Sequence, residues 1–487
     1  MATDSNRFQA IISHCKEYGF IFPSSEIYDG LGAVYDYGQW GSELKKNIKD
    51  YWWKSMTQMR ENIVGIDAAI FMHPTTWKAS GHVDNFSDPM IDNKDSKKRY
   101  RVDHLIEAKA EELEKEGHAE QAEILLKEMD TLLAANDFDG LKILIENNKI
   151  VCAISGTSNW TDVRQFNLMF STEFGAVSTD EENIVYLRPE TAQGIFVNFL
   201  NVQKTGRMKI PFGIAQIGKA FRNEIVARQF IFRMREFEQM EMQFFIRPGT
   251  QKEWYEYWKA ERMKWHLSLG IAEDKYRFHD HVKLAHYADA ACDIEYNFPI
   301  GFKEVEGIHS RTDFDLRNHQ EYSKKKLQYF DNDVDPATGK PYGNYIPYVI
   351  ETSIGVDRTV MMVLSEAYEE EDLSTEEKKD SRVVLKFPPK LAPIKLAILP
   401  LVKKDGLPEI AREIMNICKE HFKCFYEEKD TIGKRYRRMD AIGTPFCVTV
   451  DHQTKEDNTV TIRYRDTMLQ ERINIAEIKE RVLQSLS

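Results

Sequence analysis

The segment that most restricts how this chain can fold is residues 221–245, with the sequence FRNEIVARQFIFRMREFEQMEMQFF. Polar and apolar side chains alternate along its second half, which predicts a strand with two unlike faces because residues two apart share a face. The polar face carries Arg233, Arg235, Phe237, Gln239, Glu241 and Gln243, and the apolar face carries Met234, Met240, Met242 and Phe244. Burying such a polar face is costly unless ligands occupy it. We therefore expect the strand to form one wall of a binding cleft, with a solvated surface hairpin as the alternative.

The length of 487 residues exceeds what one hydrophobic core normally serves, so two or three domains are expected. Strands joined by long excursions predict an α+β domain with an antiparallel sheet over 1–365, interrupted by a polar helical insertion at about 100–165. A charged segment followed by prolines predicts a linker over 366–390. Alternating strand and helix patterns then predict a compact α/β domain over 391–487.

Local patterns predict several individual elements. Apolar spacing predicts helices over 39–59 and 251–268 and a helical hairpin over 103–147 that breaks at Gly117. The segment ENIVGIDAAIFMHP predicts a strand that stops at Pro74.

Composition excludes several classes of protein. The chain is 42% hydrophobic and 30% charged, as folded globular proteins are, and it has no apolar run long enough to cross a bilayer. Its N-terminus has neither the basic region nor the apolar core of a signal peptide, so a cytoplasmic location without a membrane is expected. The six cysteines are scattered with no CxxC pair, which favours reduced buried thiols over disulfides.

The pattern Arg222-x-Glu224, a basic loop and then Arg233-x-x-x-Phe237-x-x-x-Glu241 resembles motif 2 of the class II aminoacyl-tRNA synthetases. Within that class, REFEQME is particularly similar to the glycyl-tRNA synthetases of the homodimeric α2 type. Residues 39–74 resemble motif 1, which forms the dimer interface in the class, and ETSIGVDR at 351–358 resembles motif 3. LRPETAQGIF, GFKEVEGIHSRTDFDL and the last hundred residues, which resemble an anticodon-binding domain, extend the similarity over nearly the whole chain.

The resemblance implies a site for ATP. It implies that Arg222 holds the α-phosphate, that Phe237 and Arg358 enclose the adenine, and that Glu304 ligates Mg²⁺ through the ATP phosphates. Arg222 and Arg358 are the implied catalytic residues. The implied nucleotide-binding set is Arg222, Asn223, Glu224, Phe232, Arg233, Met234, Arg235, Glu236, Phe237, Glu304, Val305, Gly355, Val356, Asp357 and Arg358.

The resemblance also implies a pocket for glycine, in which Glu190 and Glu241 receive the ammonium and Glu351 and Ser353 close the space. A pocket of this size rejects larger amino acids by steric exclusion and needs no editing site. The implied glycine-binding set is Arg101, Glu190, Phe237, Glu238, Gln239, Met240, Glu241, Glu351, Thr352, Ser353, Ile354 and Gly355. The alternative for Arg101 is an exposed charge on the insertion.

Two departures from the family pattern matter. Many members have a DCKxC-like stretch that can bind zinc, whereas the corresponding IDNKDSKK at 91–98 has no cysteine, so no zinc is predicted. The insertion at 103–165 has little sequence that resembles the family. His73, His82, His104 and His309 lack metal-ligand spacing and are expected to be structural residues.

The sequence also has a local basic cluster, although its formal charge is −12. Lys434, Arg435, Arg437 and Arg438 surround Tyr436, a composition that suits either RNA contact or a solvated helix face. If they bind RNA, Arg435, Arg437 and Arg438 are candidates for contacts with the anticodon stem-loop.

The leading hypothesis is an ATP-dependent, homodimeric ligase that forms glycyl-adenylate and transfers glycine to the 3′ end of tRNA(Gly). A synthetase-like protein without catalysis is the alternative from another class. Such proteins usually lose the motif arginines, and Arg222, Arg233 and Arg358 are all present. Within the enzymes, a synthetase for serine, threonine or proline is the nearest alternative.

Overall fold

The computed structural model describes residues 4–174, 184–225, 229–282, 284–285, 287–376 and 379–486. Contacts divide the chain into two compact units. The first contains Met1–Ala69, Glu190–Lys219 and Gln229–Ser487, and the second contains Ile70–Pro189 and Ala220–Arg228. The second unit is larger than the insertion predicted at 100–165, and it includes that insertion.

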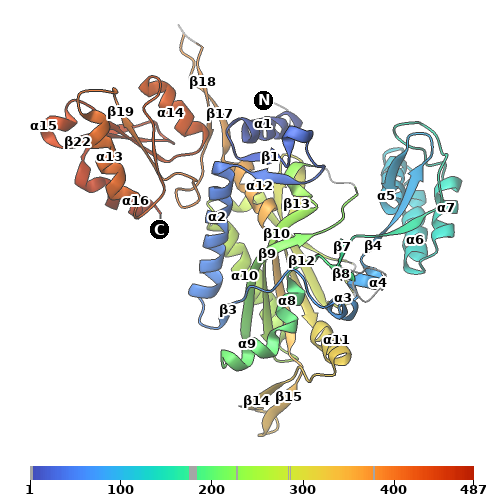
Figure 1. Ribbon diagram of the computed structural model, residues 1–487. Helices are drawn as coiled ribbons and strands as arrows, with labels where there is room; N and C mark the ends of the chain where they lie inside the picture. Colours follow the sequence, from blue (N-terminus) through green and yellow to red (C-terminus); the bar gives the residue numbers. More distant parts are fainter. Residues whose placement is uncertain are drawn as a thin grey trace. The chain divides into compact units, whose positions relative to one another are not determined.

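A seven-stranded sheet forms the centre of the first unit (Figure 1). In order across the sheet its strands are β11 (Tyr276–Asp280), β12 (Ala290–Phe298), β13 (Gly301–Thr312), β16 (Tyr348–Gly355), β10 (Glu236–Ile246), β9 (Phe212–Phe221) and β3 (Ile63–Gly65). The strands from β11 to β10 pair antiparallel, while β3 and β9 pair parallel. The mixed α and β architecture with an antiparallel sheet confirms the fold class expected from the sequence.

The two faces of β10 have the opposite characters that the sequence predicts. Met240, Met242 and Phe244 are almost completely buried in the main core. They pack beneath α10 (Gln251–Leu267) and α12 (Val356–Ala367), and the Phe244 ring lies 5.2 Å from that of Trp258 on α10. The predicted helix at 251–268 is confirmed.

The N-terminal segment of the first unit contains α1 (Asp4–Glu17), β1 (Ile21–Pro23), β2 (Tyr35–Tyr37) and α2 (Gln39–Trp53), which continues as a short π-helix over Lys54–Gln58. The helix predicted at 39–59 is confirmed. The strand predicted to run to Pro74 is wrong for most of its length, because only Ile63–Gly65 is paired in the sheet. Pro74 instead begins α3 (Pro74–Ala79), a position where proline is favoured since it needs no hydrogen-bond donor.

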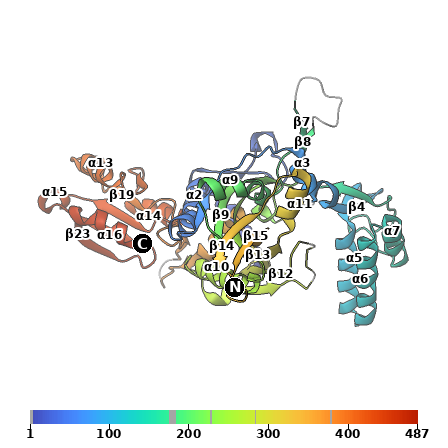
Figure 2. The same cartoon turned by 90° about the horizontal axis from the view of Figure 1, so that it is seen from below.

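The second unit packs three helices around a core of its own. The helices α5 (Val102–Lys115), α6 (Ala119–Ala134) and α7 (Phe138–Asn147) lie together (Figure 2). The predicted hairpin is therefore a three-helix arrangement. The break at Gly117 is confirmed by its φ of 87°, and a second break at Asn136 comes before Asp137, whose side chain caps α7. The unit's other elements are α3, α4 (His82–Asn85), β4 (Ser87–Asn93), β5 (Lys98–Arg101), β6 (Arg164–Asn167), β7 (Ser171–Glu173) and β8 (Ile184–Tyr186).

Three short helices close one end of the central sheet. They are α8 (Ala192–Val197), α9 (Phe199–Thr205) and α11 (Phe314–Ser323), and they share a buried cluster with Phe212 and Phe245 of the sheet. A hairpin of β14 (Tyr329–Val334) and β15 (Pro341–Tyr345) extends from this end (Figure 1).

The segment predicted as a linker at 366–390 contains two strands that pair with each other, in place of the unpaired extended chain expected. β17 (Tyr368–Asp372) and β18 (Ser381–Leu385) are antiparallel, and Arg382 is buried with its guanidinium 2.9 Å from Asp440. Ion pairs such as Arg382 with Glu371, at 2.6 Å, hold these charged strands together, although their composition gives no apolar strand pattern.

The C-terminal part has a five-stranded sheet and its own core, as predicted for an α/β domain. The sheet order is β20 (Cys424–Tyr426), β19 (Leu396–Pro400), β21 (Phe446–Val450), β22 (Thr459–Tyr464) and β23 (Gln470–Asn474). The helices are α13 (Leu407–Cys418), α14 (Ile432–Ala441), α15 (Thr454–Asp457) and α16 (Ile478–Ser485).

The basic cluster on α14 is only partly available to a ligand. Arg435 is buried and donates to the carbonyls of Pro400, Leu401 and Glu427 at 2.7 to 3.3 Å. Its predicted contact with an anticodon stem-loop is therefore wrong, because a helix residue facing the sheet cannot reach a surface ligand. Arg437 pairs with Asp380 at 2.9 Å and Arg438 pairs with Asp430 at 2.8 Å, and both remain partly exposed.

Two helical glycines provide a matched test of packing. A Cβ on Gly41 in α2 would lie 1.9 Å from the Phe20 carbonyl oxygen, whereas a Cβ on Gly433 in α14 would meet nothing within 4 Å. We expect Gly41→Ala to lower the free energy of unfolding by about 2 kcal/mol or more, because backbone must move to admit the methyl group. Gly433→Ala should raise it by up to about 1 kcal/mol through helix propensity. Urea denaturation followed by circular dichroism measures both, and equal effects would contradict the close approach at Gly41.

Candidate active site

A buried carboxyl group on the polar face of β10 marks the centre of the site. Glu241 lies opposite Ser353 in the register of β10 and β16, and only 1% of its surface is exposed. Its carboxyl accepts hydrogen bonds from the Ser353 hydroxyl at 2.6 Å, from Gln239 Nε2 at 3.1 Å and from the Thr191 hydroxyl. Burial, together with the nearby charges of Glu351 and Glu190, raises the pKa of Glu241 to about 7. This group can therefore change its charge near neutral pH.

The neighbouring acid on β16 is held in the opposite charge state. Glu351 accepts from Arg311 Nη1 at 2.7 Å and from Gln243 Nε2 at 3.1 Å, and it lies 3.2 Å from His309 Nδ1. Burial opposes its ionisation, but the Arg311 charge and the His309 hydrogen bond are stronger and lower the pKa of Glu351 to about 2. The two carboxyls thus differ in protonation although both are buried.

A second layer of polar residues fixes these acids. Arg311 also donates to both carboxylate oxygens of Asp315, at 2.9 and 3.1 Å. Gln193 Nε2 donates to Asp315 at 2.9 Å and to Glu190 Oε1 at 3.0 Å, so the amide joins α11 to Glu190. His319 Nε2 lies 2.8 Å from the Gln193 carbonyl oxygen. Each side chain of this second layer therefore has a partner, which favours a rigid polar site, whereas the Oε1 atoms of Gln239 and Gln243 accept no hydrogen bond from the described residues.

Sequence reasoning did not single out several of these supporting residues, namely Thr191, Gln193, Arg311, Asp315 and His319. For Arg311 the available signal was the polar side chains at alternate positions in GFKEVEGIHSRTDFDL, because they give β13 a polar face beside that of β16. Thr191 and Gln193 belong to LRPETAQGIF, and His319 lies outside both segments.

The implied nucleotide residues Arg358, Glu304 and Phe232 lie together. Arg358 Nη1 is 2.9 Å from Glu304 Oε2, and its guanidinium carbon is 4.5 Å from the centre of the Phe232 ring. Phe232 belongs to η4 (Phe230–Phe232), the turn before β10, and the Glu304 side chain is 45% exposed. A cation, an aromatic face and an accessible carboxylate thus meet near one end of the sheet, a combination suited to a purine nucleotide with its metal.

Part of the implied set faces away from Glu241, Glu238 because side chains alternate along β10 and Asp357 because it lies in the first turn of α12. Glu238 pairs with Lys45 at 2.8 Å and Lys49 at 3.0 Å, and Asp357 pairs with Lys45 at 2.7 Å and accepts from the Tyr37 hydroxyl. The structure does not bring these two acids to Glu241. Other members of the set have almost no exposed surface and lie with their side chains in or beside the core: Met234, Met240, Val305, Thr352, Ile354 and Val356.

The residues just before β10 also differ from the expected pattern. The strand begins at Glu236, so Arg233 and Arg235 precede it and do not continue its polar face. Arg235 Nη1 donates to the Gly32 carbonyl at 3.0 Å, and Glu236 pairs with Lys219. Gly355 ends β16 next to Arg358, and the half-buried Phe237 is on the Glu241 face of β10.

The remaining implied residues belong to the second unit. Arg222 directly follows β9, where its Nε donates to the Pro189 carbonyl at 3.1 Å and its guanidinium lies 5.5 Å from the Phe86 ring. Asn223 and Glu224 follow it along the chain. Arg101 pairs with Asp88 at 3.1 Å and with Asp103 at 2.5 Å. Part of the predicted basic loop, residues 226–228, lies outside the described residues.

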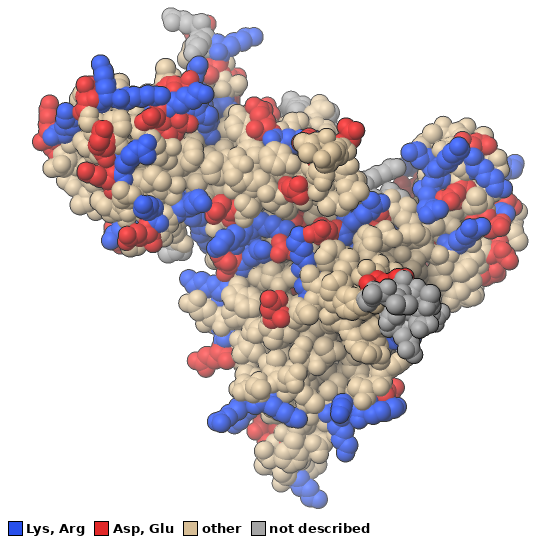
Figure 3. Space-filling model, in the orientation of Figure 1, with Lys and Arg blue, Asp and Glu red and all other residues tan. Residues whose placement is uncertain are grey.

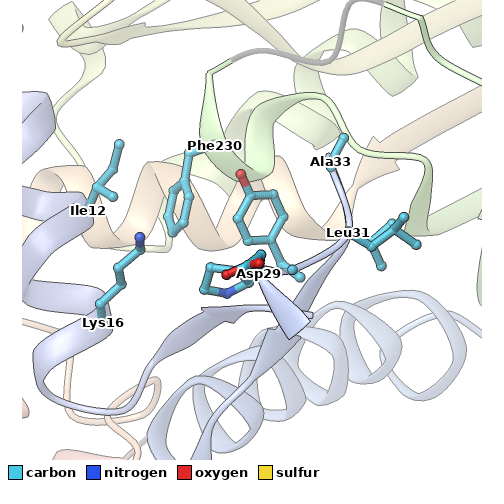
Figure 4. Close-up of a pocket in the computed structure, with 11 residues that line it drawn as sticks. Ile12, Lys16, Asp29, Leu31, Ala33 and Phe230 are labelled. Carbon is cyan, nitrogen blue, oxygen red and sulfur yellow. The ribbon is translucent and has the colours of Figure 1, made fainter. Parts of the chain in front are cut away.

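A pocket of about 280 Å³ lies beside η4 (Figure 4). The loop between β1 and β2 forms one side, and it is fastened to the segment before β10 by the Arg235 bonds to Gly32 and Ala33. The residues labelled in Figure 4 are Ile12, Lys16, Asp29, Leu31, Ala33 and Phe230. This loop therefore supports the turn that carries Phe232.

The described residues contain neither a cluster of metal ligands nor a helix that could span a membrane. In the part of the chain that the structure describes, no three or more His, Cys, Asp or Glu side chains are grouped to hold a metal ion. Asn93 and Ser96 of the segment compared with zinc-binding relatives join Cys152 in one polar network, in which the Ser96 hydroxyl is 3.3 Å from the Cys152 sulfur. All six cysteines are buried free thiols. Among the described helices, none has the length and apolar character needed to cross a membrane.

Known proteins resemble the chain over almost its full length. A glycine–tRNA ligase of Chlorobaculum tepidum is 54% identical over 96% of this chain and 98% of its own. Those of Treponema denticola and Macrococcus caseolyticus are 52% and 51% identical, each over 97% of this chain. The chain belongs to the glycine–tRNA ligase family. The resemblance expected from motifs 1 to 3 is thereby confirmed.

Two family models match parts of the chain outside the central sheet. The model described as glycyl-tRNA synthetase insertion domain 1 matches residues 88–124 and 117–168, which contain α5 to α7. The insertion therefore belongs to the family, although few of the family's sequence motifs can be recognised in it by inspection. The model described as anticodon binding domain matches residues 395–485.

Arg311 provides a direct test of the buried charge network. Arg311→Met leaves Glu351 and Asp315 buried without their cation, so we expect a loss of about 3 to 5 kcal/mol in unfolding free energy. Adding Glu351→Gln and Asp315→Asn should recover part of that loss, because no unpaired charge remains. Urea denaturation of the single and triple variants measures the difference. A mild effect of Arg311→Met alone would contradict the network.

Proposed function

We propose that the chain activates glycine with ATP, forming glycyl-adenylate and pyrophosphate, and then transfers glycine to the 3′ end of tRNA(Gly). One observation carries this proposal in the structure: Glu241, Ser353 and Glu190 come from three elements to line a small acidic corner of the sheet. By analogy with its family we also propose a cytoplasmic homodimer that pairs through the region 39–74.

The acidic corner suits an amino acid without a side chain. Glu241 and Glu190 supply negative charge for the glycine ammonium, with the Ser353 hydroxyl beside them. Gln239, Thr191 and Ser353 already bond to the Glu241 carboxyl, so a bulkier substrate would have to separate these groups. This steric cost favours glycine over serine, threonine and proline.

The nucleotide end of the site suits the activation step. The ionised glycine carboxylate attacks the α-phosphorus, a new C–O–P bond forms, and the bond to pyrophosphate breaks, so no protein base is needed. Arg358 and Arg222 supply positive charge as the phosphate charge shifts. The Phe237 ring offers a flat face to adenine. Glu304 would hold Mg²⁺, which when bound neutralises phosphate charge, and one exposed carboxylate suits an ion that also takes phosphate oxygens.

Glycine-dependent exchange of labelled pyrophosphate into ATP tests this function. We expect exchange with glycine but not with serine, threonine or proline. Arg358→Ala and Arg222→Ala should each reduce it about a hundredfold or more, since each removes charge needed in the transition state. Arg317→Ala serves as the control, because its pair with Asp313 is on the surface and 48% of its side chain is exposed. Normal exchange in both test variants would contradict their roles.

The charge state of Glu241 predicts how glycine affinity depends on pH. Below its pKa of about 7 the carboxyl is neutral and binds an ammonium poorly, so affinity should rise as pH increases through about 7 and then level off. Glu241→Gln should bind weakly and lose this rise. Any dependence that remains in the variant belongs to other groups such as His309, whose pKa is raised by its hydrogen bond with Glu351 despite burial. Calorimetric titration of glycine at several pH values makes the comparison.

A further inference from the structure

A group of exposed cations lies at the end of the first unit that carries α9 and α11. We name it the basic end and define it by Lys204, Arg207, Lys209, Lys324, Lys325 and Lys326. All six side chains are exposed, and within the described parts of the chain none of them takes part in an ion pair.

Two distant stretches of sequence meet at this end. Lys209 precedes Ile210 and Lys326 precedes Leu327, and both apolar side chains are buried in the same cluster with Phe199. The Tyr329 hydroxyl is also hydrogen-bonded to the backbone of Ile210. Figure 3 shows Lys and Arg side chains on both sides of the base of the β14–β15 hairpin, over the ends of α9 and α11. The segments that contain Lys209 and Lys326 therefore lie together, and the other four cations are close to these two along the chain.

Neighbouring residues leave the basic end positive. Asp331 is buried and bonded to Arg247 at 2.8 Å and to the Tyr345 hydroxyl at 2.7 Å. Asp333 on β14 is exposed and pairs with Arg247 at 3.3 Å, and Glu321 is the exposed acid that directly adjoins the lysines in the sequence. Two exposed aromatic side chains lie alongside, Tyr322 with 54% and Phe330 with 55% of their surface accessible. Cations and accessible rings on one surface suit phosphates and bases together.

We propose that the basic end binds the phosphate backbone of RNA. A chain with a formal charge of −12 gains no solubility by gathering six cations, and their mutual repulsion costs stability unless an anion approaches. Five of the six are lysines, which bind phosphate as mobile point charges and release counterions without reading base edges. The contact is thus independent of sequence, and it is separate from the α14 cluster of the anticodon-binding domain. The choice of tRNA as the RNA rests on the proposed function.

Charge reversal tests this inference. The variant Lys324→Glu, Lys325→Glu, Lys326→Glu should bind a tRNA(Gly) transcript at least about tenfold more weakly at moderate salt. The slope of log affinity against log salt should fall by about 2 to 3, since each lost phosphate contact removes about 0.7 to 0.9. Arg207→Glu with Lys209→Glu should act in the same direction. Fluorescence anisotropy over a series of KCl concentrations measures both quantities.

The matched control replaces the three lysines by arginine, which keeps the charge and should retain the affinity and slope. Glycine-dependent pyrophosphate exchange, which needs no tRNA, should be unchanged in every variant. Failure of exchange in the unaltered protein would count against the proposed function alone. Unchanged RNA affinity and slope in both reversal variants, or equal losses with arginine and glutamate, would overturn the RNA surface.

Discussion

The pairing of β10 with β16 is the constraint on which the rest of the site depends. Its register sets Glu241 opposite Ser353 and Gln243 opposite Glu351. Because side chains alternate between faces, a slip of one residue would turn Met240 and Met242 into the site and bury the acids in the core. The apolar packing beneath the sheet therefore also determines which groups can meet a ligand.

The same register creates an electrostatic problem that the fold solves with a second polar layer. Buried carboxyls close to one another cannot all be ionised at low cost. Arg311 keeps Glu351 charged, whereas Glu241 has no cation partner among its hydrogen bonds and holds its proton to about pH 7. A ligand that brings its own positive charge completes the Glu241 environment. An ammonium group is thus the natural complement of this corner.

Much of this site could be predicted from sequence, and the failures have physical causes. The two faces of 237–244 followed from period-two alternation, which depends on local backbone alone. The sequence could not show that Glu238 and Asp357 lie away from Glu241, because both acids pair with Lys45, which is distant from them in the chain. The burial of Arg435 could not be predicted for a similar reason, because only the packing of α14 shows that this side chain turns inward and donates to carbonyl groups.

A crystal structure with glycine and a non-hydrolysable ATP analogue tests the acidic corner most directly. The structure described here predicts the glycine nitrogen within about 3 Å of a Glu241 oxygen, with its carboxylate directed toward the α-phosphate. The analogue's adenine should lie beside Phe237 and Arg358. Glycine bound elsewhere, or bound with its carboxylate rather than its ammonium toward Glu241, would contradict this assignment.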